Sequence, residues 1–88
     1  MDSTFNKLQT ILYEKFSFHY DQVQLETQLE LELGMDSREM FELLTELEES
    51  FKITIDLDEL DNVLKQTKVL RINDLVVYIN EKQLLKES

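Results

Sequence analysis

Apolar residues recur at spacings of three and four in four segments of the chain, and this spacing predicts four amphipathic helices. The helices are expected from Ser3 to Phe16, from Ser37 to Phe51, from Asp58 to Gln66 and from Ile72 to Leu84. They predict an all-α fold, a small four-helix bundle with a long loop between the first and second helices, and a single domain over residues 1–88. The core positions expected from the spacing are Phe5, Leu8, Ile11, Leu12, Phe16, Met40, Phe41, Leu43, Leu44, Leu47, Phe51, Leu57, Leu60, Val63, Leu64, Ile72, Leu75, Val76 and Ile79.

Residues 23–33 follow a different pattern, in which apolar and polar side chains alternate, and residues 51–57 repeat it. A period of two is typical of half-buried strands, so a fold of helices with two paired strands is the alternative. Leucine, glutamate and glutamine are better helix formers than strand formers, and a two-stranded sheet alone is only marginally stable. We therefore expect extended loops that insert alternate apolar side chains into the helical core. These side chains are Val23, Leu25, Leu29, Leu31 and Leu33, and then Phe51, Ile53, Ile55 and Leu57.

The junction between the long loop and the second helix holds the only glycine of the chain, Gly34. Asp36 or Ser37 is expected to be the N-cap of the helix, and Glu39 stands at the spacing of a capping box from Asp36. A serine at a helix N-terminus is most often a simple cap. The same place also suits a phosphate ester on Ser37, because free amide hydrogens and the positive end of the helix dipole stabilise negative charge there.

Acidic charge is concentrated in the middle of the chain. Residues 26–61 contain thirteen acidic and two basic side chains, a net charge of −11, whereas the rest of the chain carries six acidic and seven basic side chains, a net charge of +1. Such a field repels nucleic acids and anionic membranes and favours basic protein partners. Its simplest consequence is solubility.

Several functional classes lack their characteristic residues. The chain has no cysteine, which excludes disulfides and thiolate metal sites and favours a cytoplasmic location. The N-terminus lacks the basic and apolar regions of a secretory signal, and no apolar stretch approaches the roughly 20 residues that span a bilayer. The single histidine, His19, has no spacing that indicates Ser-His-Asp catalysis and is expected in a loop. The acidic run Asp56, Asp58, Glu59 and Asp61 lacks the glycine and terminal glutamate of a calcium loop and is interpreted as surface charge, not as a metal site.

The chain resembles the acyl carrier protein family over most of its length, from about Val23 to Lys82. The resemblance rests on a joint pattern that is far more specific than an Asp-Ser pair alone. The pattern consists of Leu33-Gly34-Met35-Asp36-Ser37, then Glu42-Leu43, Leu47-Glu48-Glu49, Phe51 and Ile53-x-Ile55, with Val23 and Leu29 upstream and Tyr78-Ile79 downstream.

The resemblance implies a carrier protein that catalyses nothing itself. Ser37 would carry 4′-phosphopantetheine, attached from coenzyme A by a phosphopantetheinyl transferase, with Asp36 beside it at the cofactor site. The arm would hold acyl groups as thioesters for acyl-loading and acyl-transferring enzymes of fatty-acid, polyketide or related metabolism. The acidic second helix would be the docking surface for basic patches on these partners, and the carrier is expected to be a monomer. Its partner-binding residues would be Arg38, Glu39, Glu42, Glu46, Glu48 and Glu49.

Four features depart from the family pattern: Arg38, Thr45, Arg71 in place of the threonine that often caps the last helix, and a segment from Ile55 to Ile79 that is longer than in a typical member. Arg38 stands directly after the serine, where the family usually has leucine, and Thr45 stands where it often has an apolar residue. We interpret them as marks of a specialised carrier that serves a dedicated pathway. Two alternatives remain open at this point: a carrier of aminoacyl or peptidyl groups, and an unmodified carrier-like adaptor that binds basic partners through its acidic helix.

Overall fold

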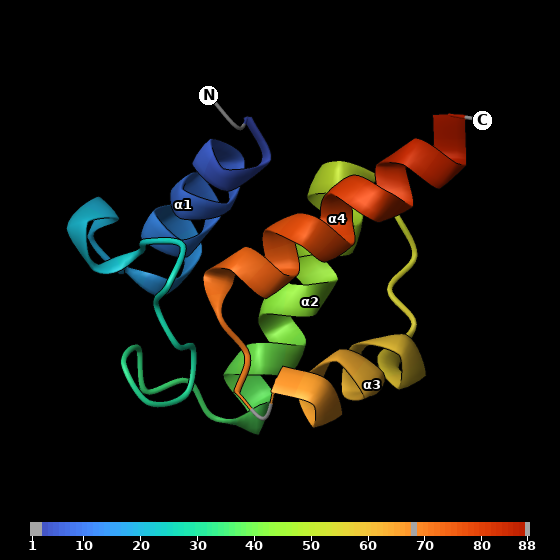
Figure 1. The fold of residues 1–88 in the computed structure, drawn as a ribbon. Helices are drawn as coiled ribbons and strands as arrows, with labels where there is room; N and C mark the ends of the chain where they lie inside the picture. Colours follow the sequence, from blue (N-terminus) through green and yellow to red (C-terminus); the bar gives the residue numbers. More distant parts are fainter. Residues whose placement is uncertain (1–2, 68, 88) are drawn as a thin grey trace.

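The protein is a bundle of α-helices in this computed structural model, which describes residues 3–67 and 69–87, without the side chains of residues 63, 64, 66, 67 and 85–87. The prediction of an all-α fold is confirmed. α4 crosses α2 and contacts α1, and α3 is a shorter helix near the end where α2 begins (Figure 1). The first two helices have the predicted bounds, and the last two extend slightly beyond them. The helices are α1, Ser3–Phe16; α2, Ser37–Phe51; α3, Leu57–Thr67; and α4, Ile72–Glu87; a short 3-10 helix, η1, spans Tyr20–Gln22.

The core lies where α1, α2 and α4 meet, and α1 contacts both of the other two helices. Fully burying one leucine or isoleucine contributes roughly 2 kcal/mol, so the seven described side chains that these helices bury completely dominate the stability of the bundle. The predicted core positions Val63 and Leu64 lie outside the described side chains. The seven described side chains of these helices without exposed surface are Leu8, Leu12, Leu43, Leu47, Ile72, Leu75 and Ile79.

Two predicted core positions are wrong. Phe41 on α2 is 64% exposed and Leu57 at the start of α3 is 57% exposed. The buried stripe of α2 is complete without Phe41, because Leu43 and Leu47 fill it, and α1 ends at Phe16. Leu57 is the first residue of its helix, so no preceding turn of α3 covers it.

The loop before α2 forms no strand within the described residues, and the alternative with two paired strands is wrong. Its single pairing is an isolated antiparallel bridge between Gln28 and Arg71. Two turns interrupt the alternation, one of them closed by the bond from Glu32 N–H to Gln28 O at 3.0 Å. Leu25 and Leu31 are therefore 39% and 76% exposed, against the prediction that they insert into the core. The side chains that the loop does bury are Val23, Thr27, Leu29, Leu33 and Met35.

The same loop is held against the connection between α3 and α4. Backbone groups of the two segments pair directly, which satisfies polar groups that would otherwise be buried without partners. Met35 N–H also donates to Leu29 O at 3.1 Å, so the loop is closed on itself just before α2 begins. The pairs between the two segments are Leu29 N to Leu70 O at 3.0 Å, Ile72 N to Thr27 O at 3.0 Å, and Asn73 N to Leu25 O at 2.9 Å.

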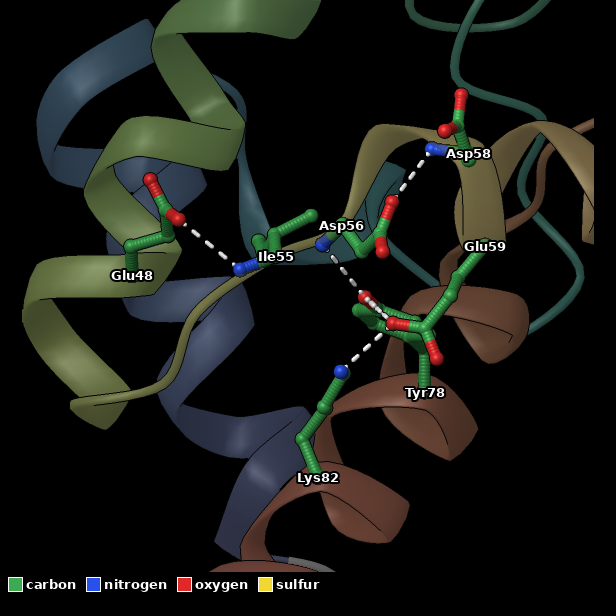
Figure 2. A network of polar contacts seen from close by, with 7 residues as sticks. All are labelled: Glu48, Ile55, Asp56, Asp58, Glu59, Tyr78 and Lys82. Carbon is green, nitrogen blue, oxygen red and sulfur yellow. Dashed lines mark hydrogen bonds and ion pairs between the residues drawn. The ribbon is translucent and has the colours of Figure 1, made fainter.

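A polar network holds the opposite end of α2 and the start of α3 (Figure 2). The Glu48 carboxylate on α2 accepts a bond from Ile55 N–H at 2.9 Å. The Asp56 carboxylate accepts from Asp58 N–H at 2.8 Å and so occupies the start of α3. These bonds fix the connection between α2 and α3.

Tyr78 on α4 completes this network. Its hydroxyl accepts a bond from Asp56 N–H at 3.0 Å and donates to Glu59 at 3.1 Å, and Glu59 also pairs with Lys82 at 2.6 Å (Figure 2). Burial, opposed by the Asp56 N–H and reinforced by the bond to Glu59, raises the pKa of the Tyr78 phenol. The bond to Glu59 likewise raises the pKa of the Lys82 ammonium. The network therefore joins α3 to α4, and its Tyr78 phenol and Lys82 ammonium keep their protons at neutral pH.

Candidate functional site: the start of the acidic helix

Gly34 makes a turn in the last residues of the loop before α2. It has a φ of 67°, in the left-handed region that favours glycine. No atom lies within 4 Å of the position that a Cβ would take, so the requirement for glycine is conformational and not steric. The turn lies between Leu33 and Met35, which are both buried, and the chain reaches the surface directly after Met35, at Asp36 and Ser37.

Of the two predicted candidates, Asp36 and not Ser37 is the N-cap of α2, and the predicted capping box is confirmed. Its carboxylate accepts a bond from Glu39 N–H at 2.8 Å, and the Glu39 carboxylate accepts from Asp36 N–H at 3.3 Å. Ser37 is therefore the first residue of the helix and not its cap. The Ser37 hydroxyl is free of the structural role that a serine most often has at this place.

The Ser37 side chain lies on the surface, and no hydrogen bond within the described residues involves its hydroxyl. The first intrahelical bond runs from Met40 N–H to Asp36 O at 2.9 Å. Because Asp36 uses the amide of Glu39, the amides of Ser37 and Arg38 are the ones that remain at this helix end. These two amides and the helix dipole favour an anionic group on the serine oxygen.

Arg38 places a cation beside this serine. Its side chain is 87% exposed and pairs with Glu42, one turn along the helix, at 3.3 Å. Exposed pairs of this kind contribute only about 0.3–0.5 kcal/mol, and a cation in the first turn opposes the helix dipole. Stability therefore does not account for an arginine at this position.

The five predicted docking glutamates of α2 fall into two groups. Three of them already have bonds inside the protein: Glu39 in the capping box, Glu42 with Arg38, and Glu48 with Ile55 N–H. Within the described residues, no side-chain hydrogen bond or ion pair involves Glu46 or Glu49. The helix therefore presents carboxylates of unequal availability, which the sequence does not reveal.

Sequence reasoning missed a groove beside α2. It has a volume of about 420 Å³ and lies between the end of α1 and the first half of α2. No signal in the sequence could have revealed it, because the adjacent apolar pairs Met40-Phe41 and Leu43-Leu44 look alike, yet Leu43 and Leu44 are both buried and Phe41 is exposed. The lining residues are Lys15, Phe16, Phe41, Glu42, Thr45 and Glu46.

Other candidate sites receive little support. His19 is exposed at the start of η1, and its backbone N–H donates to Gln22 at 2.9 Å. Within residues 3–67 and 69–87, no cluster of three or more histidine and carboxylate side chains is arranged to hold a metal ion. In the same part of the chain, no helix has the length and apolar character needed to cross a membrane.

Comparison with known proteins identifies the family to which this chain belongs. Residues 6–66 match the model of the family described as "Phosphopantetheine attachment site". The acyl carrier protein of Campylobacter jejuni (strain RM1221) is 32% identical over 78 residues, 89% of this chain and 94% of that protein. The acyl carrier protein of Streptococcus pyogenes serotype M1 is 32% identical over 80 residues, with 91% and 96% covered, and that of Trieres chinensis is 32% identical over 69 residues, with 78% and 86% covered.

The chain therefore belongs to the acyl carrier protein family, and it is a carrier and not an enzyme. Its prosthetic group is 4′-phosphopantetheine. Membership implies interaction with a phosphopantetheinyl transferase and with acyl-handling enzymes. The start of α2 fits such a group, since it combines an exposed hydroxyl, two available amides and a nearby guanidinium with open space beside Gly34.

Proposed function

We propose that this protein carries acyl groups as thioesters on a 4′-phosphopantetheine arm attached to Ser37, and that it serves a dedicated fatty-acid, polyketide or related pathway. The proposal includes residues 1–88 acting as one monomeric carrier domain in the cytoplasm. When bound, the arm supplies the thiol that forms the thioester.

The observation that carries the proposal is the exposure of Ser37 and its freedom from a capping role. It is exposed at the first position of α2, and a neighbouring aspartate, not the serine, caps the helix. An enzyme can reach this hydroxyl without unfolding the helix. The two adjacent amides and Arg38 stabilise the negative charge of a phosphodiester at the serine oxygen.

The chain's other residues hold and present this position. The Asp36–Glu39 capping box keeps the helix end intact while its serine is modified. The bonds between the loop and the connection before α4 fix the approach of the chain to Gly34. The acidic face of α2 attracts partners with basic surfaces and raises their rate of encounter.

Mass spectrometry of the protein co-expressed with a broad-specificity phosphopantetheinyl transferase tests the attachment site. We expect a gain of one phosphopantetheine that is absent from Ser37→Ala and present in Ser50→Ala, a serine change near the other end of the same helix. A full gain in Ser37→Ala would show that another residue is modified. No gain in the unaltered protein with any transferase would favour the unmodified adaptor.

The kind of carried group is tested on the modified protein. Loading with an acyl group by an acyl-activating enzyme, detected as a thioester by intact mass, is the expected result. Loading only by an amino-acid-activating enzyme would favour the aminoacyl or peptidyl carrier.

A further inference from the structure

We propose that the Arg38 guanidinium changes partner when Ser37 is modified: it leaves the Glu42 carboxylate and binds the phosphodiester on Ser37, so that Glu42 is unpaired only in the modified protein. This inference rests on the proposed function, because it requires a phosphodiester on Ser37. The exchange of ion pairs depends on Arg38, which stands where the acyl carrier protein family usually has leucine. It would distinguish the modified carrier from the unmodified one.

The existing pair between Arg38 and Glu42 is weak. It joins Nε to Oε1 at 3.3 Å, and the two side chains are 87% and 52% exposed, so water and salt screen their attraction. The order of the two charges is also the less favourable one, since an acidic residue N-terminal to a basic one suits the helix dipole better than the reverse. An anion within reach of the guanidinium can therefore displace the carboxylate.

The direction of the Arg38 side chain favours an exchange toward Ser37. The Cα–Cβ bonds of an α-helix tilt toward its N-terminus, so a long side chain tends to cover the turn before its own Cα. To reach Glu42, one turn later, the Arg38 side chain extends against this tilt. The opposite course takes the guanidinium over the start of α2, where Ser37 is the adjacent residue.

A phosphodiester on Ser37 is the better partner for this guanidinium. The planar fork of an arginine binds phosphate oxygens through two parallel N–H bonds. The phosphodiester would be tethered to the neighbouring residue, so the contact requires less ordering than one between two long, exposed side chains. Its negative charge would also offset the unfavourable effect of a cation in the first turn of α2.

Glu42 depends on Arg38 in a way that the other bonded glutamates of α2 do not. Glu39 accepts from Asp36 N–H in the capping box, and Glu48 accepts from Ile55 N–H, and both of these donors are backbone amides. Within the described residues, the pair with Arg38 is the single side-chain bond of Glu42. Loss of this pair would therefore leave the Glu42 carboxylate to water.

The exchange moves negative charge along the helix. The charge that modification adds at Ser37 would be neutralised there by Arg38, and an unpaired carboxylate would appear at Glu42, about 7.5 Å farther along the axis of α2. A basic protein that contacts this turn of the helix would meet one more unpaired carboxylate on the modified carrier. The state of Ser37 would thus be readable without contact with the arm.

NMR spectroscopy of the Arg38 side chain tests the exchange, before and after modification with coenzyme A and a broad-specificity transferase, with intact mass confirming the gain. The chain has two arginines, Arg38 and Arg71, so the Nε–H resonance of Arg38 is assigned by its absence from Arg38→Lys. In the unmodified protein, we expect Glu42→Gln to shift this resonance. In the modified protein, the sensitivity to Glu42→Gln should be lost.

Phosphorus NMR of the modified protein observes the other half of the exchange. Arg38→Gln should shift the phosphodiester resonance relative to the unaltered protein, whereas Glu42→Gln should leave it unchanged. Glu46→Gln is the matched control, because Glu46 lies one turn beyond Glu42 on α2 and makes no side-chain bond within the described residues. It should leave both resonances unchanged in either form.

Three results would overturn the inference. The first is an Arg38 resonance that Glu42→Gln does not shift in the unmodified protein, since the pair would then be absent in solution. The second is a resonance that Glu42→Gln still shifts after modification, since the guanidinium would then remain on Glu42 or bridge both anions. The third is a phosphorus resonance that Arg38→Gln does not shift.

The mass measurement keeps these results apart from a failure of the proposed function. In all three cases the unaltered protein would still gain phosphopantetheine on Ser37, so the proposed function would stand. A protein that no transferase modifies on Ser37 would overturn the proposed function, and the exchange would fail with it.

Discussion

The two ends of α2 differ in how much of their polar chemistry the protein uses for itself. At the C-terminal end, Glu48 accepts from Ile55 N–H, and Lys7 on α1 donates to Ser50 O at 2.8 Å. At the N-terminal end, a capping box keeps the helix intact but leaves the Ser37 hydroxyl and two amides available. One end is joined to its neighbours and the other end is open to a partner.

This difference shows that identical residues on one helix have different roles. Glu46, Glu48 and Glu49 are close in sequence and acidic alike, yet only Glu48 meets a backbone donor from another segment. A uniform acidic docking face is therefore too simple a description. The proposed docking of basic partners on α2 would use the carboxylates that the fold has left without bonds.

The largest expected effect on stability comes from the substitution of Glu48. Glu48→Ala should lower the free energy of unfolding by about 2 kcal/mol, because it removes a bond from a charged group and leaves a partly buried amide without a partner. Urea unfolding followed by circular dichroism measures the loss. Glu49→Ala is the matched control and should change stability by less than about 0.5 kcal/mol. Equal losses in the two variants would contradict the distinction between the ends.

Removal of the Tyr78 hydroxyl should have the next largest effect on stability. Tyr78→Phe removes a group that bonds both Asp56 N–H and Glu59, and we expect a loss of about 1 kcal/mol in the free energy of unfolding. Binding to the transferase should be unaltered, because the network lies at the joined end of α2. A loss of affinity without a loss of stability would show that the network contributes to docking.

The pH dependence of stability sharpens the same prediction. The pKa of Tyr78 is raised on folding by burial, and that of Lys82 is raised by its bond to Glu59. Their contribution is fully present below the unfolded pKa of Tyr78, about 10, and is lost as the pH rises above it. Thermal unfolding between pH 8 and pH 11, in steps of about half a unit, should show this decline, and the decline should be shallower in Tyr78→Phe.

Substitutions of Gly34 give the corresponding test at the N-terminal end of α2. Gly34→Ala should destabilise the protein by about 1 kcal/mol, since an L-residue is strained at its φ of 67° although there is space for the methyl group. Gly34→Asn should cost less, because asparagine tolerates the left-handed region. Chemical unfolding compares the three proteins. An alanine variant as stable as the unaltered protein would mean that the turn does not require glycine.

The smallest expected effect on stability belongs to Arg38. Arg38→Gln should change the free energy of unfolding by at most about 0.5 kcal/mol, because the pair with Glu42 is exposed. Its effect should instead be found in the rate of Ser37 modification, measured by mass spectrometry over time. A large destabilisation with an unchanged rate would assign Arg38 to the fold and not to the site.

Local signals explain what the sequence predicted well. The bounds of α1 and α2 follow from apolar spacing and from the Asp36–Glu39 capping box, all of which act within a few residues. The place of Ser37 at the helix start depends on the same local chemistry. The family pattern then added the prosthetic group, which no periodicity indicates.

Contacts between distant segments explain what the sequence did not predict. Leu25 and Leu31 belong to the same alternation as their buried neighbours, but turns held by the connection before α4 leave both exposed. The exposure of Phe41 depends on where α1 ends relative to α2. The division among the glutamates depends on the path of the chain after α2, which brings the Ile55 amide to Glu48.

The bonds between the loop and the α3–α4 connection have a consequence for synthesis on the ribosome. The loop that leads to Gly34 pairs with residues 70–73, which emerge after α2 and α3 have been made. A nascent chain that stops short of Leu70 contains the serine and the whole acidic helix, yet lacks the partners that order their approach. Because of this long-range pairing, the native shape of the approach to α2 forms only after residues 70–73 have been made.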